Sequence, residues 1–240
     1  MNKLLEKIFI ESGFRIYYPK FLEDGQNKNF FAVNESINKK EYFLITFFDY
    51  ISKKKLTDLI NRQAFEYYSN LKKLSFYEKE MQKNTSLIIC LKEKKLTLDR
   101  DKKKSIYEVE EDLYNFKKYV LVYTERQIQD FESNYITYKP REIKLIKHLQ
   151  NILNNSKSFK QFKFNLEEDT FYNLITKLFI KLPFLNLKTL KSATLENLEQ
   201  KIKEELKIIE TFDFIDTILQ KNEIEDMDEE NFLSEIGVIE

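Results

Sequence analysis

The chain has 240 residues, 42% of them hydrophobic and 15% aromatic, so it is long and apolar enough to bury a substantial core in one large domain or two small ones. Its 40 Lys and Arg residues balance 40 Asp and Glu residues, which argues against a globally basic nucleic-acid-binding protein. The single cysteine, Cys90, excludes an intrachain disulfide, and no apolar run approaches the roughly 18 residues of a membrane span, so we expect a cytoplasmic protein.

The first 138 residues predict a mixed β-sheet with helices packed against it. Apolar residues at helical spacing predict a helix over 2–12, and Gly13 suits its C-cap. Strands are predicted over 14–18, 29–34, 41–49 and 86–92, with a helix over 56–74 between the last two. The segments 41–49 and 86–92 are apolar on both alternating faces, which is typical of central strands covered on both sides. We therefore expect these two strands to lie side by side.

A change of charge marks the segment 105–124. Its first part contains Ile106, Tyr107 and Val109, the β-branched and aromatic residues that are typical of a strand. Acidic and then basic residues follow, and 119–123 predicts a second strand. A connection of this kind between two strands carries contacts or chemistry more often than packing. The alternative is a solvated loop between two core strands.

The residues on either side of this segment are also informative. Residues 92–104 are too charged to pack and predict an exposed hairpin or loop. Thr124 and Gln127 have the spacing of a capping box and predict the start of a helix over 125–135.

Strand signals stop after residue 138, and the rest of the chain predicts helices. These are expected over 141–154, 165–182 and 194–219, with a linker over 154–158 and an acidic tail over 222–240. We therefore predict an α+β protein, with a mixed α/β sheet domain over 1–138 followed by an all-α region over 139–240 that ends in the acidic tail.

The sequence offers little for catalysis. With one histidine, His148, and one cysteine, zinc sites of the Cys/His kind are excluded, and neither a P-loop nor a GxGxxG motif is present. We expect no catalytic residue, no metal and no cofactor. One alternative is a Mg²⁺-dependent nuclease of the restriction type, active or degenerate, in which Asp49, Glu93 and Lys95 hold the metal and position a water.

The charges are unevenly distributed. Residues 53–104 hold 15 basic and 7 acidic residues, whereas 196–240 hold 4 basic and 15 acidic residues. Such asymmetry is typical of partner surfaces. A second alternative is therefore a free-standing DNA-binding protein, because lysines of the basic stretch could contact phosphates. The candidates are Lys53, Lys54, Lys55, Lys102, Lys103 and Lys104. The aromatic residues that read single strands are absent from these lysine runs.

The segment 106–124, IYEVEEDLYNFKKYVLVYT, resembles the signature region of the middle components of bacterial ABC-three-component systems, the Lamassu-type anti-phage defence operons. Members of that family carry a segment similar to EEDPYxFKKYVLxYT. The fitting positions are Glu110, Glu111, Asp112, Tyr114, Phe116, Lys117, Lys118, Tyr119, Val120, Leu121, Tyr123 and Thr124. Leu113 stands where the pattern has a proline. The resemblance covers residues 40–135.

The resemblance implies an accessory role without a reaction of its own. Such a subunit would join an SMC- or RecN-like ABC ATPase, which senses foreign DNA, to an effector that is commonly a nuclease. It would hold the effector inactive until activation. We expect the partner contact in 110–118, through Glu110, Glu111, Asp112, Tyr114, Phe116, Lys117 and Lys118. Charge-assisted pairs there would confer specificity more than affinity.

Overall fold

The computed structural model describes residues 1–24, 27–34, 40–137 and 144–187. The chain divides into two compact units, Met1–Lys188 and Thr189–Glu240, and the fold below is that of the first. The predicted helix over 194–219 and the acidic tail over 222–240 lie outside the described residues. Among the helices that are described, none has the length and apolar character to span a bilayer.

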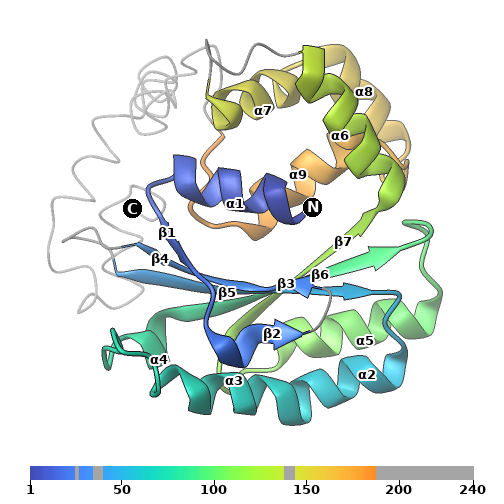
Figure 1. The fold of residues 1–240 in the computed structure, drawn as a ribbon. Helices are drawn as coiled ribbons and strands as arrows, with labels where there is room; N and C mark the ends of the chain where they lie inside the picture. Colours follow the sequence, from blue (N-terminus) through green and yellow to red (C-terminus); the bar gives the residue numbers. More distant parts are fainter. Residues whose placement is uncertain (25–26, 35–39, 138–143, 188–240) are drawn as a thin grey trace, which may run out of the picture. The chain divides into compact units, whose positions relative to one another are not determined.

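A mixed sheet forms the centre of the described residues, with five strands in the order β1-β4-β5-β6-β7 (Figure 1). The strands are β1 (Arg15–Tyr17), β4 (Phe30–Asn34), β5 (Glu41–Asp49), β6 (Thr85–Glu93) and β7 (Lys117–Thr124). The pairs β1–β4 and β4–β5 are antiparallel, and β5–β6 and β6–β7 are parallel. Ile45 lies opposite Ile88, so the expected pairing of the two apolar strands is confirmed. A short hairpin joins β2 (Glu23–Asp24) to β3 (Asn27–Lys28).

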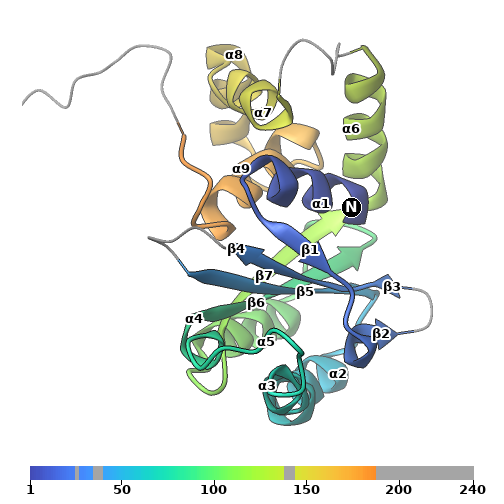
Figure 2. The same cartoon turned by 60° about the vertical axis from the view of Figure 1, so that its left-hand side comes forward.

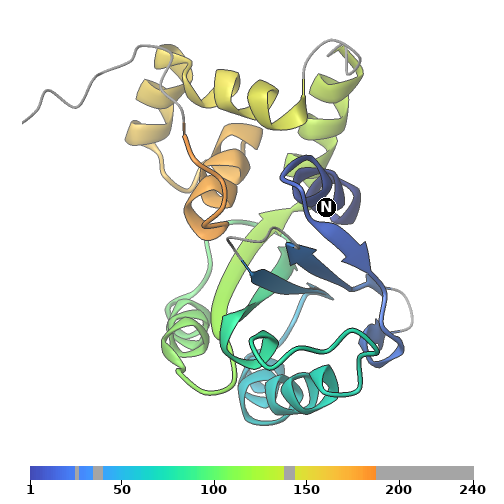
Figure 3. The ribbon, with the colours of Figure 1, turned by 90° about the vertical axis from the view of Figure 1, so that its left-hand side faces the viewer.

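Helices cover both faces of this sheet (Figures 1 and 2). One face carries α2 (Lys53–Asp58), η2 (Leu59–Gln63), α3 (Ala64–Leu71), α4 (Met81–Asn84) and α5 (Arg100–Glu111). On the other side lie α1 (Asn2–Glu11), α6 (Glu125–Thr137), α7 (Leu145–Leu153), α8 (Ser156–Phe164) and α9 (Phe171–Lys181). A 3₁₀ turn, η1 (Lys20–Leu22), precedes the β2–β3 hairpin. Figure 3 shows the layers from the side, with light-green α5 below the sheet and orange α9 above it.

The two central strands bury side chains on both faces, as their apolar sequences predict. On β5, Phe43 packs in the core shared with α1, and Leu44 packs in the core shared with α2 and α3. On β6, Cys90 and Leu91 alternate in the same way. Cys90 is fully buried and burial raises the pKa of its thiol, so it acts as a small hydrophobic residue.

The helices after residue 144 belong to the same compact unit. Leu149 of α7 and Leu178 of α9 are fully buried in the core cluster that contains Phe9 of α1. The Glu11 carboxylate also accepts a hydrogen bond from the Ile146 backbone N–H at 3.1 Å, which fixes the first turn of α7 on α1. The predicted α+β class, a mixed sheet followed by helices, is confirmed for the described residues. Whether residues 1–138 fold as a separate domain stays a prediction.

Two predicted helix boundaries are wrong. The proposed linker over 154–158 contains the start of α8, which Asn155 caps by accepting from the Ser158 N–H at 3.0 Å. The helix predicted over 165–182 begins only at Phe171, and Thr170 is its N-cap. Both errors arise because Asn and Ser favour caps as much as loops.

Candidate functional site

Helix α5 replaces the strand predicted around Ile106. The Asp99 carboxylate accepts from the Lys102 backbone N–H at 2.8 Å and caps the first turn. Ile106 and Val109 are buried, while Tyr107 is 61% exposed. A strand would bring Tyr107 and Val109 to one face, whereas a helix brings Ile106 and Val109 together. The strand prediction is therefore wrong, and the prediction of a loop over 92–104 is wrong at both ends, where β6 finishes and α5 starts.

The loop between α5 and β7 is organised by a buried lysine. The Lys118 side chain is 0% exposed, and its ammonium group forms an ion pair with the Asp112 carboxylate. It also donates to the backbone carbonyls of Asp112 at 3.1 Å, Tyr114 at 2.6 Å and Phe116 at 3.1 Å. One positive charge thus binds the end of α5 and every second carbonyl of the loop, those of residues 112, 114 and 116. Such a charge is also favourable at a helix C-terminus, where the carbonyls point outward.

Glu110 fixes the same region from the helix side. Its carboxylate accepts from the Val120 backbone N–H at 2.8 Å, so the last turn of α5 is attached to edge strand β7. The same oxygen accepts from the Lys181 ammonium at 2.5 Å, which links this point to the end of α9. The sequence motif gave no indication of the Lys181 contact, because the two residues lie 71 positions apart.

The loop is completed by an aromatic contact and a backbone turn. Phe116 is 3% exposed, and its ring meets that of Tyr68 edge-on at 5.7 Å between centroids. Asn115 has a φ of +66°, the left-handed conformation that Asn tolerates better than most residues. Four of the predicted contact residues therefore hold the loop in place: Glu110, Asp112, Phe116 and Lys118.

The remaining side chains of the loop point outward. Leu113 is 93% exposed and Tyr114 is 77% exposed, and Glu111 and Lys117 are also exposed. The Lys117 ammonium lies 5.3 Å from the centre of the Tyr119 ring. The motif thus separates into an inward set that builds the loop and an outward set that is available to a partner. Leu113, which stands where the family pattern has a proline, was not among the predicted contact residues.

The lysines predicted to contact DNA differ in their surroundings. Lys102 pairs with Glu93, Lys103 with Glu167 at 2.6 Å, and Lys104 with Glu108 at 3.9 Å. Three carboxylates therefore lie beside this lysine run and reduce its attraction for phosphates. Direct DNA contact through these residues stays a prediction.

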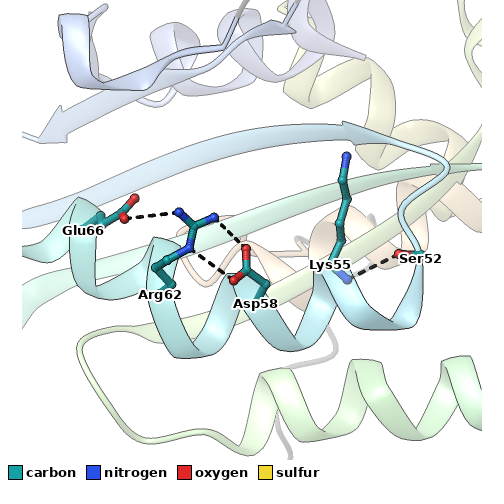
Figure 4. A network of polar contacts seen from close by, with 5 residues as sticks. All are labelled: Ser52, Lys55, Asp58, Arg62 and Glu66. Carbon is teal, nitrogen blue, oxygen red and sulfur yellow. Dashed lines mark hydrogen bonds and ion pairs between the residues drawn. The ribbon is translucent and has the colours of Figure 1, made fainter.

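The other predicted lysines, Lys53, Lys54 and Lys55, form the start of α2. Ser52 caps this helix by accepting from the Lys55 backbone N–H at 3.4 Å. Figure 4 shows the Lys55 side chain extending away from the neighbouring ion pairs. In those pairs Arg62 contacts Asp58 at 2.9 Å and Glu66 at 3.7 Å.

Asp49 and Glu93, two residues of the nuclease alternative, lie at the ends of neighbouring strands but have different contacts. Asp49 lies opposite Lys92 at the carboxyl ends of β5 and β6. Glu93 is ion-paired with the Lys102 ammonium, so a cation already occupies its carboxylate. Within the described ranges no group of three or more His, Cys, Asp or Glu residues is placed to hold a metal ion. His148 is half-buried on α7, and burial lowers its pKa.

Comparison with protein families gives a match over the middle of the chain. A family model described as ABC-three component (ABC-3C) system Middle Component 1 matches residues 29–152, a little more than half of the chain. The matched stretch contains β4 to β7 and the whole loop between α5 and β7. Neither the curated proteins nor the solved structures gave a match.

Proposed function

We propose, because the chain belongs to the middle component 1 family of ABC-three-component systems, that it bridges the other components of such a system. The family makes it an accessory subunit of a multi-component defence system. In our proposal one partner is an SMC- or RecN-like ABC ATPase that senses DNA, and the other is a nuclease-type effector. The subunit holds the effector inactive until the ATPase engages DNA, and it does so in the cytoplasm.

The observation that carries this proposal is the exposure of Leu113 and Tyr114 on a loop whose backbone is hydrogen-bonded to a buried lysine. Their backbone is fixed by the buried ammonium of Lys118, while both side chains are largely exposed. Exposed apolar and tyrosine side chains on a well-ordered loop are typical of the centre of a protein interface. A loop that is already ordered loses little conformational entropy when a partner binds.

Two charged neighbours complete the proposed contact. Glu111 and Lys117 are exposed on either side of the Leu113–Tyr114 pair. Charges at the rim of an interface select the partner and its orientation more than they increase affinity. We therefore assign affinity to Leu113 and Tyr114, and specificity to Glu111 and Lys117.

Co-purification tests the bridging role. The affinity-tagged chain is expressed together with the proposed ABC ATPase and effector subunits, and both partners should be retained. Leu113→Ser together with Tyr114→Ser should release at least one of them. Phe65→Ser with Ile10→Ser is the matched control, because these residues are 59% and 60% exposed on α3 and α1. Full retention of both partners by the loop variant would contradict the proposed contact.

The role proposed here is non-catalytic. The nuclease alternative predicts that the isolated chain cleaves DNA with Mg²⁺ and that Asp49→Ala abolishes cleavage. A free-standing DNA-binding protein would bind DNA and retain neither neighbouring component.

A further inference from the structure

Helix α8 presents a surface that the bridging role does not use. Within this fully described helix no residue is buried. Phe159 is 46% exposed and Phe164 is 92% exposed. Lys157, Lys160 and Lys163 are exposed between them. A helix that buries none of its side chains needs an explanation for its two exposed phenylalanines.

The charged residues of α7 and α8 themselves have one sign. Residues 144–164 contain five lysines and no aspartate or glutamate, in a chain where acidic and basic residues are equal in number. Among the described residues none of the three α8 lysines is ion-paired with a carboxylate, in contrast to Lys102 and Lys103. The burial of the described residues leaves all three ammonium-bearing side chains exposed.

Lysines and phenylalanines are intermixed around the exposed side of α8. At 100° per residue, the order around the helix is Lys157, Phe164, Lys160, Lys163 and Phe159, over an arc of roughly 160°. The Lys163 ammonium lies 4.9 Å from the centre of the Phe159 ring, so a cation and an aromatic face are already adjacent. Phe162 turns away from this arc and lies 5.6 Å from the Tyr172 ring.

We propose that this face of α8 binds single-stranded nucleic acid. The lysines would contact successive phosphates, and Phe159 and Phe164 would stack on bases. A lipid surface is the weaker fit, because a helix that lies in a membrane separates its apolar and cationic residues onto different faces. Here they interdigitate on one face, as phosphates and bases do along a strand.

The test uses the full-length chain and fluorescence anisotropy with a labelled oligothymidine and a labelled duplex. The chain should bind oligothymidine, with affinity that falls at least about tenfold between roughly 50 and 200 mM salt. Lys157→Glu, Lys160→Glu and Lys163→Glu together should weaken binding at least about tenfold. Phe159→Ala with Phe164→Ala should weaken oligothymidine binding more than duplex binding.

The matched control reverses the exposed Lys72, Lys73 and Lys79 and should leave binding within about twofold. Because α8 buries no residue, the variants should keep the parent's circular dichroism. If the reversed variant unfolds, the corresponding three Lys→Gln substitutions take its place. Several outcomes would overturn the inference: no saturable binding by the parent, equal loss in the control, full binding by the α8 variants, or binding to anionic vesicles without binding to oligothymidine. Each would leave the bridging role intact, since co-purification tests that role separately.

Discussion

The buried Lys118 and the partly buried Asp112 form an ion pair at the point where helix α5 ends and the chain turns toward β7. The same ammonium group donates a hydrogen bond to the Asp112 backbone carbonyl at 3.1 Å. Lys118 therefore binds both the side chain and the backbone of the residue that ends the helix. The acidic and basic residues of this segment therefore stabilise the loop itself. Its acidic and basic members meet each other across the loop before any partner is involved.

Lys118→Met should lower the free energy of unfolding by about 3–5 kcal/mol, because it leaves the Asp112 carboxylate and the loop carbonyls without their donor. Lys117→Met is the matched control, since the neighbouring side chain is exposed, and it should change stability by less than about 0.5 kcal/mol. Urea denaturation of both variants measures the difference. Equal small effects would mean that the buried ammonium does not organise the loop. Adding Asp112→Asn to Lys118→Met should recover part of the loss, as expected of residues in direct contact.

Leu113→Pro should be tolerated and should raise the free energy of unfolding by about 0.4–1 kcal/mol. Asp112 has φ −66° and ψ 120°, an extended conformation that is compatible with a following proline. Leu113 is 93% exposed, so its side chain contributes little packing. Among the described residues its N–H makes no backbone hydrogen bond that a proline would remove. Leu113→Ala, which keeps the backbone freedom, should not produce the gain. A lower urea midpoint for Leu113→Pro would refute this reading of the turn.

The central strands were predictable and α5 was not, for a physical reason. Strands β5 and β6 are buried on both faces, so their sequences are continuous apolar runs that few other structures tolerate. Helix α5 buries one narrow face, and its Ile106 and Val109 occur beside Tyr107, which gives the composition of a strand. The Asp99 cap and the three-residue spacing of Ile106 and Val109 were the signals for a helix.

Part of the candidate site could also be predicted. The motif located the loop, but it did not separate Lys117, which is exposed, from Lys118, which is buried. That division depends on contacts within the loop and on Lys181, which is distant in sequence. Helix α8 was missed because Asn155 and Ser156, at its start, favour loops as much as helix caps, and because none of its residues is buried.

Gln127→Ala should lower the free energy of unfolding by about 1–3 kcal/mol. The predicted capping box is present: Gln127 accepts from the Thr124 N–H at 3.1 Å, and Thr124 accepts from the Gln127 N–H at 3.2 Å. Gln127 is fully buried and also donates to the Thr170 carbonyl at 2.9 Å. The substitution therefore leaves the Thr124 N–H and the carbonyl of Thr170, the residue that caps α9, without this partner. Gln129→Ala, an exposed change on the same helix, is the control and should have almost no effect. If both variants unfold at the same urea concentration, the box contributes nothing.

Lys177 should make stability depend on alkaline pH. Burial lowers its pKa to about 8, although Asp169 and Glu167 act in the opposite direction. Below pH 8 the lysine is protonated in both the folded and unfolded chains, and burial of the charge lowers stability by a constant amount. Between pH 8 and the ordinary lysine value of 10.5, the unfolded chain binds more protons, so this group makes stability rise with pH.

Lys177→Met should therefore be more stable than the parent at pH 7, and this advantage should shrink steadily as the pH rises from 8 toward 10. The urea midpoints of the two proteins, measured at the same pH values, give their difference in stability at each pH. Tyrosines titrate equally in both proteins, so their contribution cancels in this difference. Lys147→Met, which removes an exposed lysine of α7, should give a difference that does not change over the same range. A constant difference for Lys177→Met as well would show that the lysine keeps an ordinary pKa in the folded chain, and that its ammonium reaches water from between α9 and β7.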